Sequence, residues 1–245
     1  MLPAIKGVML VDLVKRGGRA LGLEITHYRP SGRRRMDLLA EHGIELVLDV
    51  GADRGQYATD LRRHGYRGRI VSFEPLQETF EELARAAAQD PRWECHPLAL
   101  GATGGRMPIW VTSNLASSSL LPMLHAHVQA APDVEVVSQE IADVRKLDSL
   151  DLQLDVPTLL KLDVQGYEDR VLAGAEQTLE DVALVECELS IEPLYDSQVT
   201  VLDMLKLLQE AGFRLVSLEP GFHDQAGRIL QFEALLARET TSGER

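Results

Sequence analysis

Short apolar runs rich in Val, Ile and Leu alternate with helix-like segments from about residue 44 to the end of the chain. Such runs are typical of parallel strands that helices cover on both faces. The predicted strands span residues 44–50, 69–73, 93–100, 158–164, 183–189, 213–218 and 229–237. The predicted helices span residues 55–64, 76–89, 166–175 and 199–211. This rhythm predicts an α/β fold of the doubly wound, Rossmann-like type, with a mostly parallel sheet.

Residues 107–155 interrupt the alternation. The segment is polar and is predicted to be irregular, with Asn114 and Ser117–Ser119 in its first part. A connection of this length is typical of a lid or a substrate-binding loop. The predicted division of the chain is a helical extension at 1–43, one domain at 44–238 and a frayed tail at 239–245.

The last predicted helix, residues 199–211, carries Leu202, Leu205 and Leu208 at helical spacing. We expect these three side chains to face the interior. The two strands that follow the helix are expected to form a hairpin through residues 220–227.

The charge balance limits the partners of the chain. Its 245 residues include 25 Lys and Arg against 38 Asp and Glu, for a net charge of −13. Such a chain repels phosphate backbones, so we predict no nucleic-acid partner. The basic run Arg33–Arg35 is either a solvated helix start or a contact for an anionic substrate or lipid headgroup. A homo-oligomer remains open.

The apolar runs are too short to span a membrane, because a transmembrane helix needs about 20 such residues. The N-terminus lacks a clean signal-peptide core, so we expect a cytoplasmic protein. Cys95 and Cys187 do not form a CxxC pair, which excludes a Cys-rich zinc site.

The motif VLDVGADRGQY, residues 47–57, is the strongest sign of a ligand site. A buried strand ends at Val50, the chain turns through Gly51 and Gly55, and a helix follows. Glycine permits the tight turn and lets a ligand approach the backbone closely. Glu74 ends the second strand, where a carboxylate is well placed to accept hydrogen bonds from both hydroxyls of a ribose.

The loop favours S-adenosylmethionine over a dinucleotide. A dinucleotide fingerprint reads GxGxxG, and its middle glycine is absent here. Asp49 and Asp53 would also repel a pyrophosphate, whereas S-adenosylmethionine is a cation without phosphate. The alternative is that Asp49 and Glu74 only cap helices or bind nearby backbone amides.

Together with a later motif, LLKLDVQGYEDRVLAGA at 159–175, these residues resemble the FkbM family of methyltransferases. The resemblance extends over IVSFEP at 70–75, LDSL at 147–150 and VECEL at 185–189, and covers roughly residues 44–235. It implies a class I methyltransferase fold whose seven-stranded sheet has an antiparallel last strand. It also implies methyl transfer from S-adenosylmethionine to a hydroxyl of a sugar, glycolipid or secondary metabolite.

The predicted cofactor-binding residues follow from the motif and the resemblance together. Asp53 departs from the family, which more often has Asn there, and residues 96–100 lack the Asn often found near the adenine. The predicted contacts are Asp49, Gly51, Ala52, Asp53, Gly55, Tyr57, Glu74, Pro75, Asn114, Ser117 and Asp163.

The catalytic groups are expected beyond the carboxyl ends of the later strands. Asp163 is placed to act as a base or to orient the acceptor, with helix capping as the alternative. Asp163 and Glu188 are also candidate ligands for a divalent cation such as Mg²⁺, although a structural hydrogen bond is the favoured role of Glu188. Lys161 faces the same side as Asp163 and is expected to pair with an acid.

Histidines on predicted loops are alternative bases. His125 and His223 are the predicted candidates, and His127 lies beside the first of them. Each is more often an ordinary surface residue than a catalytic one.

Two other functions share the strand, turn and acid layout: an NAD-dependent oxidoreductase, and a non-catalytic protein that binds S-adenosylmethionine.

Overall fold

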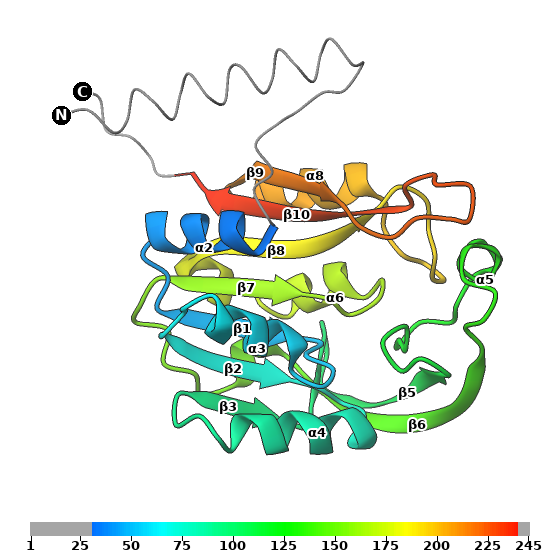
Figure 1. Ribbon diagram of the computed structural model, residues 1–245, viewed down its shortest axis with the longest axis horizontal. Helices are drawn as coiled ribbons and strands as arrows, with labels where there is room; N and C mark the ends of the chain where they lie inside the picture. Colours follow the sequence, from blue (N-terminus) through cyan, green and yellow to red (C-terminus); the bar gives the residue numbers. More distant parts are fainter. Residues whose placement is uncertain (1–30, 240–245) are drawn as a thin grey trace, which may run out of the picture.

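The computed structural model describes residues 31–239, which form a seven-stranded sheet with helices on both faces (Figure 1). The strand order is β3-β2-β1-β7-β8-β10-β9. The first five strands in this order are parallel, and β10 runs antiparallel to both β8 and β9. The strands are β1 (Leu46–Val50), β2 (Arg69–Phe73), β3 (Trp93–His96), β7 (Thr158–Leu162), β8 (Val182–Ser190), β9 (Phe213–Pro220) and β10 (Gln231–Arg238). The predicted α/β fold, with its antiparallel last strand, is confirmed.

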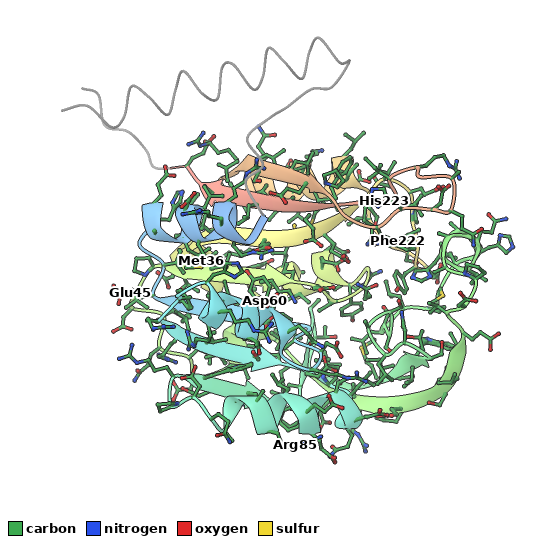
Figure 2. All side chains as sticks on the ribbon, viewed as in Figure 1. Met36, Glu45, Asp60, Arg85, Phe222 and His223 are labelled. Carbon is green, nitrogen blue, oxygen red and sulfur yellow. The ribbon has the colours of Figure 1, made fainter. Side chains whose placement is uncertain are left out.

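Two layers of helices bury the sheet. One apolar core includes Leu39, Leu61 and Leu83, from the three helices on one face. The opposite core includes Val171 and Leu208, from helices on the other face. The first layer is α2 (Ser31–Glu41), α3 (Gln56–Arg63) and α4 (Gln77–Ala87), and the second is α6 (Glu168–Ala173), α7 (Thr178–Asp181) and α8 (Val201–Glu210). Figure 2 shows Met36 of α2 and Asp60 of α3 on the same side of the sheet.

Of the predicted extension at 1–43, residues 31–41 form α2, whereas residues 1–30 lie outside the described part of the chain. The predicted tail lies outside it from residue 240 onward. Within residues 31–239, no helix has the length and apolar character that a membrane span requires.

Residues 107–155 are more regular than the sequence suggested. Residues 107–112 and 136–145 are antiparallel strands of an arm that extends from the body of the molecule (Figure 1). The arm carries its own apolar cluster, which includes Ile109 and Val144. The elements between residues 99 and 149 are β4 (Ala99–Leu100), β5 (Gly105–Thr112), α5 (His125–Ala130), β6 (Val136–Arg145) and the 3-10 helix η1 (Leu147–Ser149), of which β4, β6 and β5 form the small sheet of the arm. The prediction of an irregular loop was wrong because much of β6 is exposed, which gives it a polar composition without clear alternation.

Two smaller expectations also need correction. The predicted strand at 93–100 divides into β3 in the large sheet and β4 in the small one. On α8, Met204 and Leu208 are buried, but Leu202 is 75% exposed. The buried face is therefore rotated from the one that the leucine spacing indicated.

A row of polar residues crosses the face that α2 and α3 cover. Ser72, Asp49, Lys161 and Glu186 lie opposite one another in register on β2, β1, β7 and β8. Two residues farther along their own strands come Glu74, Gly51, Asp163 and Glu188, at the carboxyl edge of the sheet. The fold therefore gathers charged groups at the edge where open α/β sheets bind ligands.

Candidate functional site

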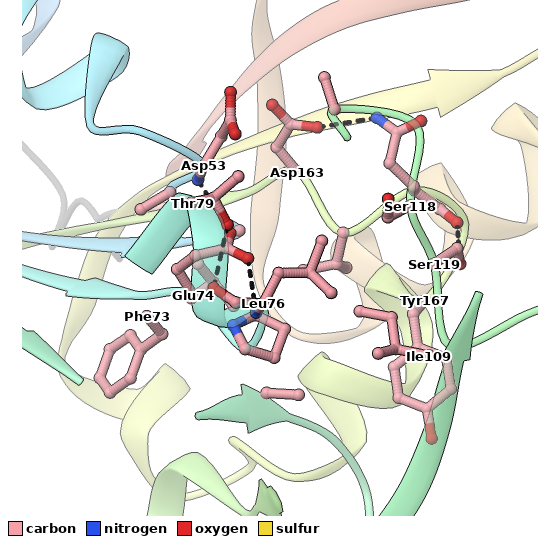
Figure 3. A pocket seen from close by; sticks show the side chains of 18 of the residues that line it. Asp53, Phe73, Glu74, Leu76, Thr79, Ile109, Ser118, Ser119, Asp163 and Tyr167 are labelled. Atoms are coloured by element: carbon pink, nitrogen blue, oxygen red, sulfur yellow. Dashed lines mark hydrogen bonds between the residues drawn. The ribbon is translucent and has the colours of Figure 1, made fainter. Parts of the chain in front are cut away.

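A cavity of about 340 Å³ lies at the carboxyl ends of β1, β2 and β7. Figure 3 shows its walls, which come from the turn after β1, the end of β2, the segment after β5 and the segment after β7. This volume is within the range of small-molecule sites. Among the predicted cofactor residues, the cavity is lined by Gly51, Ala52, Asp53, Tyr57, Glu74, Pro75 and Asp163.

The glycine turn shapes the floor of the cavity. Gly51 has a φ of +74°, and a β-carbon there would overlap the backbone carbonyl of Asp163. The backbone N–H groups of Gly51 and Ala52 both donate to the carbonyl of Phe73, at 3.0 Å each. Gly55 also has a positive φ, and a β-carbon there would lie 2.8 Å from the Trp93 ring. The absence of a side chain at Gly51 thus lets the backbone of residue 163 come close, whereas at Gly55 it makes room for the side chains packed against the start of α3.

Asp53 adopts a φ of +45°, a left-handed conformation that Asn and Asp tolerate better than other side-chain-bearing residues. The family preference for Asn at this position and the Asp found here therefore meet the same backbone requirement. This explains how the departure from the family pattern leaves the turn intact.

Glu74 presents a nearly buried carboxylate to the cavity, with 6% of its surface exposed. One oxygen accepts the backbone N–H of Asp53 at 2.9 Å, and the other accepts that of Leu76 at 2.9 Å (Figure 3). Burial raises the pKa of Glu74 despite these two bonds. Each carboxylate oxygen has a second lone pair, so the group retains the capacity to accept hydrogen bonds from two ligand hydroxyls.

Lys161 pairs with two acids, as expected. Its ammonium lies 3.1 Å from the Asp49 carboxylate and 3.4 Å from that of Asp163, and it donates to the Gly51 carbonyl at 2.9 Å. Burial alone lowers the pKa of Lys161, but Asp49 and Asp163 outweigh it and raise the pKa. Asp49 is fully buried and also accepts a hydrogen bond from Ser72 at 3.2 Å. It lies behind the cavity wall, so its contacts are those of a supporting residue.

Gln165 joins the predicted catalytic acid to its neighbours. Its side-chain N–H group donates to Asp163 at 2.9 Å and to Glu188 at 3.0 Å, while its side-chain oxygen accepts the Tyr195 hydroxyl at 2.8 Å. Its backbone carbonyl accepts the Ser119 hydroxyl at 2.7 Å. Gln165 also has a φ of +54°, which is uncommon for a residue with a side chain. These contacts fix the orientation of Asp163, whose side chain is 40% exposed.

The two acids predicted as metal ligands are therefore bridged by an amide. Burial and the nearby acids Asp163 and Glu233 raise the pKa of Glu188 well above its ordinary value. Within residues 31–239, no group of three or more His, Cys, Asp or Glu side chains is arranged to hold a metal ion. The metal role of Asp163 and Glu188 stays a prediction.

Asn114 and Ser117 lie in the loop that covers the cavity, where Leu115, Ala116 and Ser118 supply the lining. The Asn114 amide donates to the Ser117 hydroxyl at 2.9 Å, and the Asn114 side-chain oxygen accepts the Ser117 backbone N–H at 3.1 Å. In this structure the pair shapes the loop.

The three histidines lie apart from the residues that line the cavity. His125 and His127 belong to α5 rather than to a loop, and His223 lies on the connection between β9 and β10 (Figure 2). His127 is buried between the rings of Tyr195 and Phe222, at centroid distances of 5.4 and 5.5 Å. Burial lowers its pKa. The predicted catalytic roles of His125 and His223 stay predictions.

Sequence reasoning missed two further contributors, Gln165 and Arg35. Gln165 appears in the motif at 159–175, but no role was predicted for it. Arg35 forms a two-pronged contact with Glu186, which also accepts the Tyr57 hydroxyl at 2.6 Å. No local pattern pairs Arg35 with a residue 151 positions away. Arg34 also contacts Glu219, at 3.1 Å. Two residues of the basic run thus form ion pairs with acids of the same chain.

Sequence comparisons match this chain to methyltransferases. The family described as "Methyltransferase FkbM domain" matches residues 49–215. The 2-O-methyltransferase NoeI of Sinorhizobium fredii is 24% identical over 197 residues, which are 76% of this chain and 79% of that protein.

Solved structures of methyltransferases are also similar. The methyltransferase FkbM from Methylobacillus flagellatus is 18% identical with a TM-score of 0.48, and the match covers 79% of this chain. This chain spans only 43% of the length of that structure. A 1,6-didemethyltoxoflavin-N1-methyltransferase from Burkholderia thailandensis is 14% identical with a TM-score of 0.48, and covers 96% of this chain and 89% of its own. From the match over residues 49–215, we conclude that the chain belongs to the FkbM methyltransferase domain family.

Proposed function

We propose that this protein transfers a methyl group from S-adenosylmethionine to a hydroxyl of a small, carbohydrate-like acceptor. The proposed domain spans residues 44–238. The observation that carries the proposal is the position of Glu74: a nearly buried carboxylate on the cavity wall, next to a glycine turn that leaves room for a ligand.

The residues present fit this cofactor. Glu74 offers two acceptor oxygens suited to the ribose hydroxyls. Asp53 and Asp163 place carboxylates on the cavity wall, which suits a cation better than a pyrophosphate. When bound, S-adenosylmethionine supplies a methyl carbon activated by its sulfonium. The family assignment also favours methyl transfer over the NAD-dependent alternative.

Asp163 is the proposed proton acceptor. It lies at the end of β7, lines the cavity and is partly exposed, so an acceptor hydroxyl has access to it. Lys161 and Gln165 hold its two oxygens from different sides. A base fixed in this way can take the hydroxyl proton without first rearranging.

The acceptor class rests on two observations. The relative NoeI is named a 2-O-methyltransferase, which supports oxygen as the methylated atom. The net charge of −13 opposes a polyanionic acceptor such as nucleic acid. We therefore propose a small molecule with sugar-like hydroxyls.

The test is a transfer assay with S-adenosylmethionine labelled in its methyl group, run against a panel of mono- and oligosaccharides with and without Mg²⁺. We expect label on an acceptor oxygen with the wild-type protein and a loss of at least about 100-fold in rate for Asp163→Asn. The matched control is Asp151→Asn, at an exposed position, which should leave the rate unchanged.

Equal rates for the wild-type and Asp163→Asn proteins would refute the role of Asp163. If the protein binds the cofactor product S-adenosylhomocysteine but methylates no acceptor in the panel, a non-catalytic binding protein becomes the better description. A requirement for Mg²⁺ would support the predicted metal role of Asp163 and Glu188.

A further inference from the structure

We infer that Arg35 is a positioning residue of the cofactor pocket, which it shapes through Glu186 and Tyr57. Arg35 lies on α2, which precedes the matched family segment of residues 49–215. The inference rests on the proposed function, because it assigns α2 a part in binding the methyl donor.

The contact between Arg35 and Glu186 is a buried, two-pronged ion pair. The Arg35 Nε lies 2.8 Å and 3.0 Å from the two carboxylate oxygens of Glu186, and a terminal nitrogen of the guanidinium contacts the first oxygen as well. The exposed fractions of the two side chains are 22% and 4%. Burial alone lowers the pKa of Arg35, but the groups around it, Glu186 first and then Tyr57 and Glu233, together raise it, so the guanidinium stays charged.

Glu186, held in place by Arg35, in turn fixes the position of the Tyr57 hydroxyl. The Tyr57 hydroxyl donates to the Glu186 Oε2 at 2.6 Å, and burial raises the pKa of the hydroxyl well above its ordinary value. The phenol therefore keeps the proton that it donates. The Arg35 guanidinium also lies over the Tyr57 ring, 4.8 Å from its centroid. The hydroxyl of Tyr57 is thus held from β8, and the face of its ring is covered from α2.

Tyr57 is itself a wall of the cavity, in the first turn of α3. The Lys161 ammonium lies 5.3 Å from its ring centroid and donates to the carbonyl of Gly51 in the cavity floor. A change at Arg35 therefore reaches two lining elements without touching the ligand: the Tyr57 ring and the glycine turn.

Arg35 also determines which acids Lys161 can pair with. Glu186 lies opposite Lys161 in the register of β7 and β8. Without Arg35, Lys161 would be the basic residue of the described chain that lies opposite the buried Glu186 carboxylate. We expect Lys161 then to shift toward Glu186 and to weaken its contacts with Gly51 and Asp163, because an unpaired buried charge is costly.

The experiment titrates S-adenosylhomocysteine into the wild-type, Arg35→Ala, Arg35→Lys, Tyr57→Phe and Arg35→Ala/Tyr57→Phe proteins by calorimetry. We expect Arg35→Ala to weaken binding on the order of tenfold, as the loss of a supporting contact does in metal sites. Arg35→Lys should recover part of the affinity. The double variant should bind no more than about twofold more weakly than the worse single variant, because both changes act through Glu186.

The matched control is Arg34→Ala on the same helix, whose partner Glu219 lies on β9 away from the cavity lining. It should bind within about twofold of the wild type. Melting temperatures without ligand show whether each variant is folded at the titration temperature. If Arg35→Ala is unfolded at that temperature, Arg35→Lys and Tyr57→Phe serve as the test. Weaker binding by both supports the inference, and wild-type affinity of both refutes it.

Three outcomes overturn the inference. Equal affinity of the wild type and of folded Arg35→Ala would refute it and leave the proposed function standing, as would fully multiplicative losses in the double variant. No binding of S-adenosylhomocysteine by the wild type would refute the proposed function, and the inference with it.

Discussion

Gly51, at the end of β1, packs so closely against the backbone carbonyl of Asp163, at the end of β7, that a β-carbon at position 51 would overlap that oxygen. The glycine turn and the backbone of the predicted catalytic acid are therefore in direct contact. The spacing between the two strand ends depends on the absence of a side chain.

Gly51→Ala should consequently be severely destabilising. It adds a clash with backbone to an unfavourable φ of +74°, and we expect a loss of at least about 3 kcal/mol in the free energy of unfolding, measured in urea. The control is Gly43→Ala, at a φ of +61° with open space around the added carbon, which should cost about 1 to 2 kcal/mol. Similar losses for the two variants would contradict the close approach.

Lys161→Met should destabilise the fold through the acids that it leaves behind. Asp49 is fully buried, and removal of its cationic partner should cost about 3 to 5 kcal/mol in unfolding free energy. Adding Asp49→Asn should restore part of this loss. Lys206→Met, which removes an exposed pair with Glu210, should change stability by less than about 0.5 kcal/mol.

Glu168 makes stability depend on pH in a defined direction. Burial raises its pKa from 4.5 to about 7, although it accepts backbone N–H groups from Val164 and Gly166. Between these values the folded chain holds a proton that the unfolded chain has released. Stability from this group is therefore present below about pH 4.5 and falls as the pH rises to about 7.

Glu168→Gln cannot ionise and keeps an oxygen for the two backbone donors. Relative to the wild type, the variant should become more stable as the pH rises from 5 to 8, by up to about 3 kcal/mol. Urea unfolding at several pH values measures this difference, and the exposed Glu78→Gln serves as the control. A difference that does not change with pH, or that shrinks as pH rises, would contradict the raised pKa.

Much of the fold could be predicted because it depends on local pattern. Each core strand of the parallel sheet is a short apolar run, and the alternation with helices defines the doubly wound class. The arm of β5 and β6 escaped prediction because β6 is largely exposed and the first half of β5 is exposed or partly exposed, so neither shows a clear alternation over its whole length.

The site could be predicted where its residues lie in motifs at the ends of strands. Gly51, Asp53 and Glu74 follow consecutive strands, and the cavity includes all three. Arg35 acts through a partner that is distant in sequence. Gln165 reaches its partners because of its backbone conformation. The positive φ of Gln165 and the register that places Glu186 beside Arg35 exist only in the folded chain.

The central claim is that the cavity binds S-adenosylmethionine through Glu74, and calorimetric titration with S-adenosylhomocysteine tests it most directly. We predict micromolar binding by the wild type, binding at least about tenfold weaker for Glu74→Ala, unchanged binding for the exposed control Glu78→Ala, and no binding of NAD. Binding of NAD in place of S-adenosylhomocysteine, or equal affinity of the wild-type and Glu74→Ala proteins, would contradict the account.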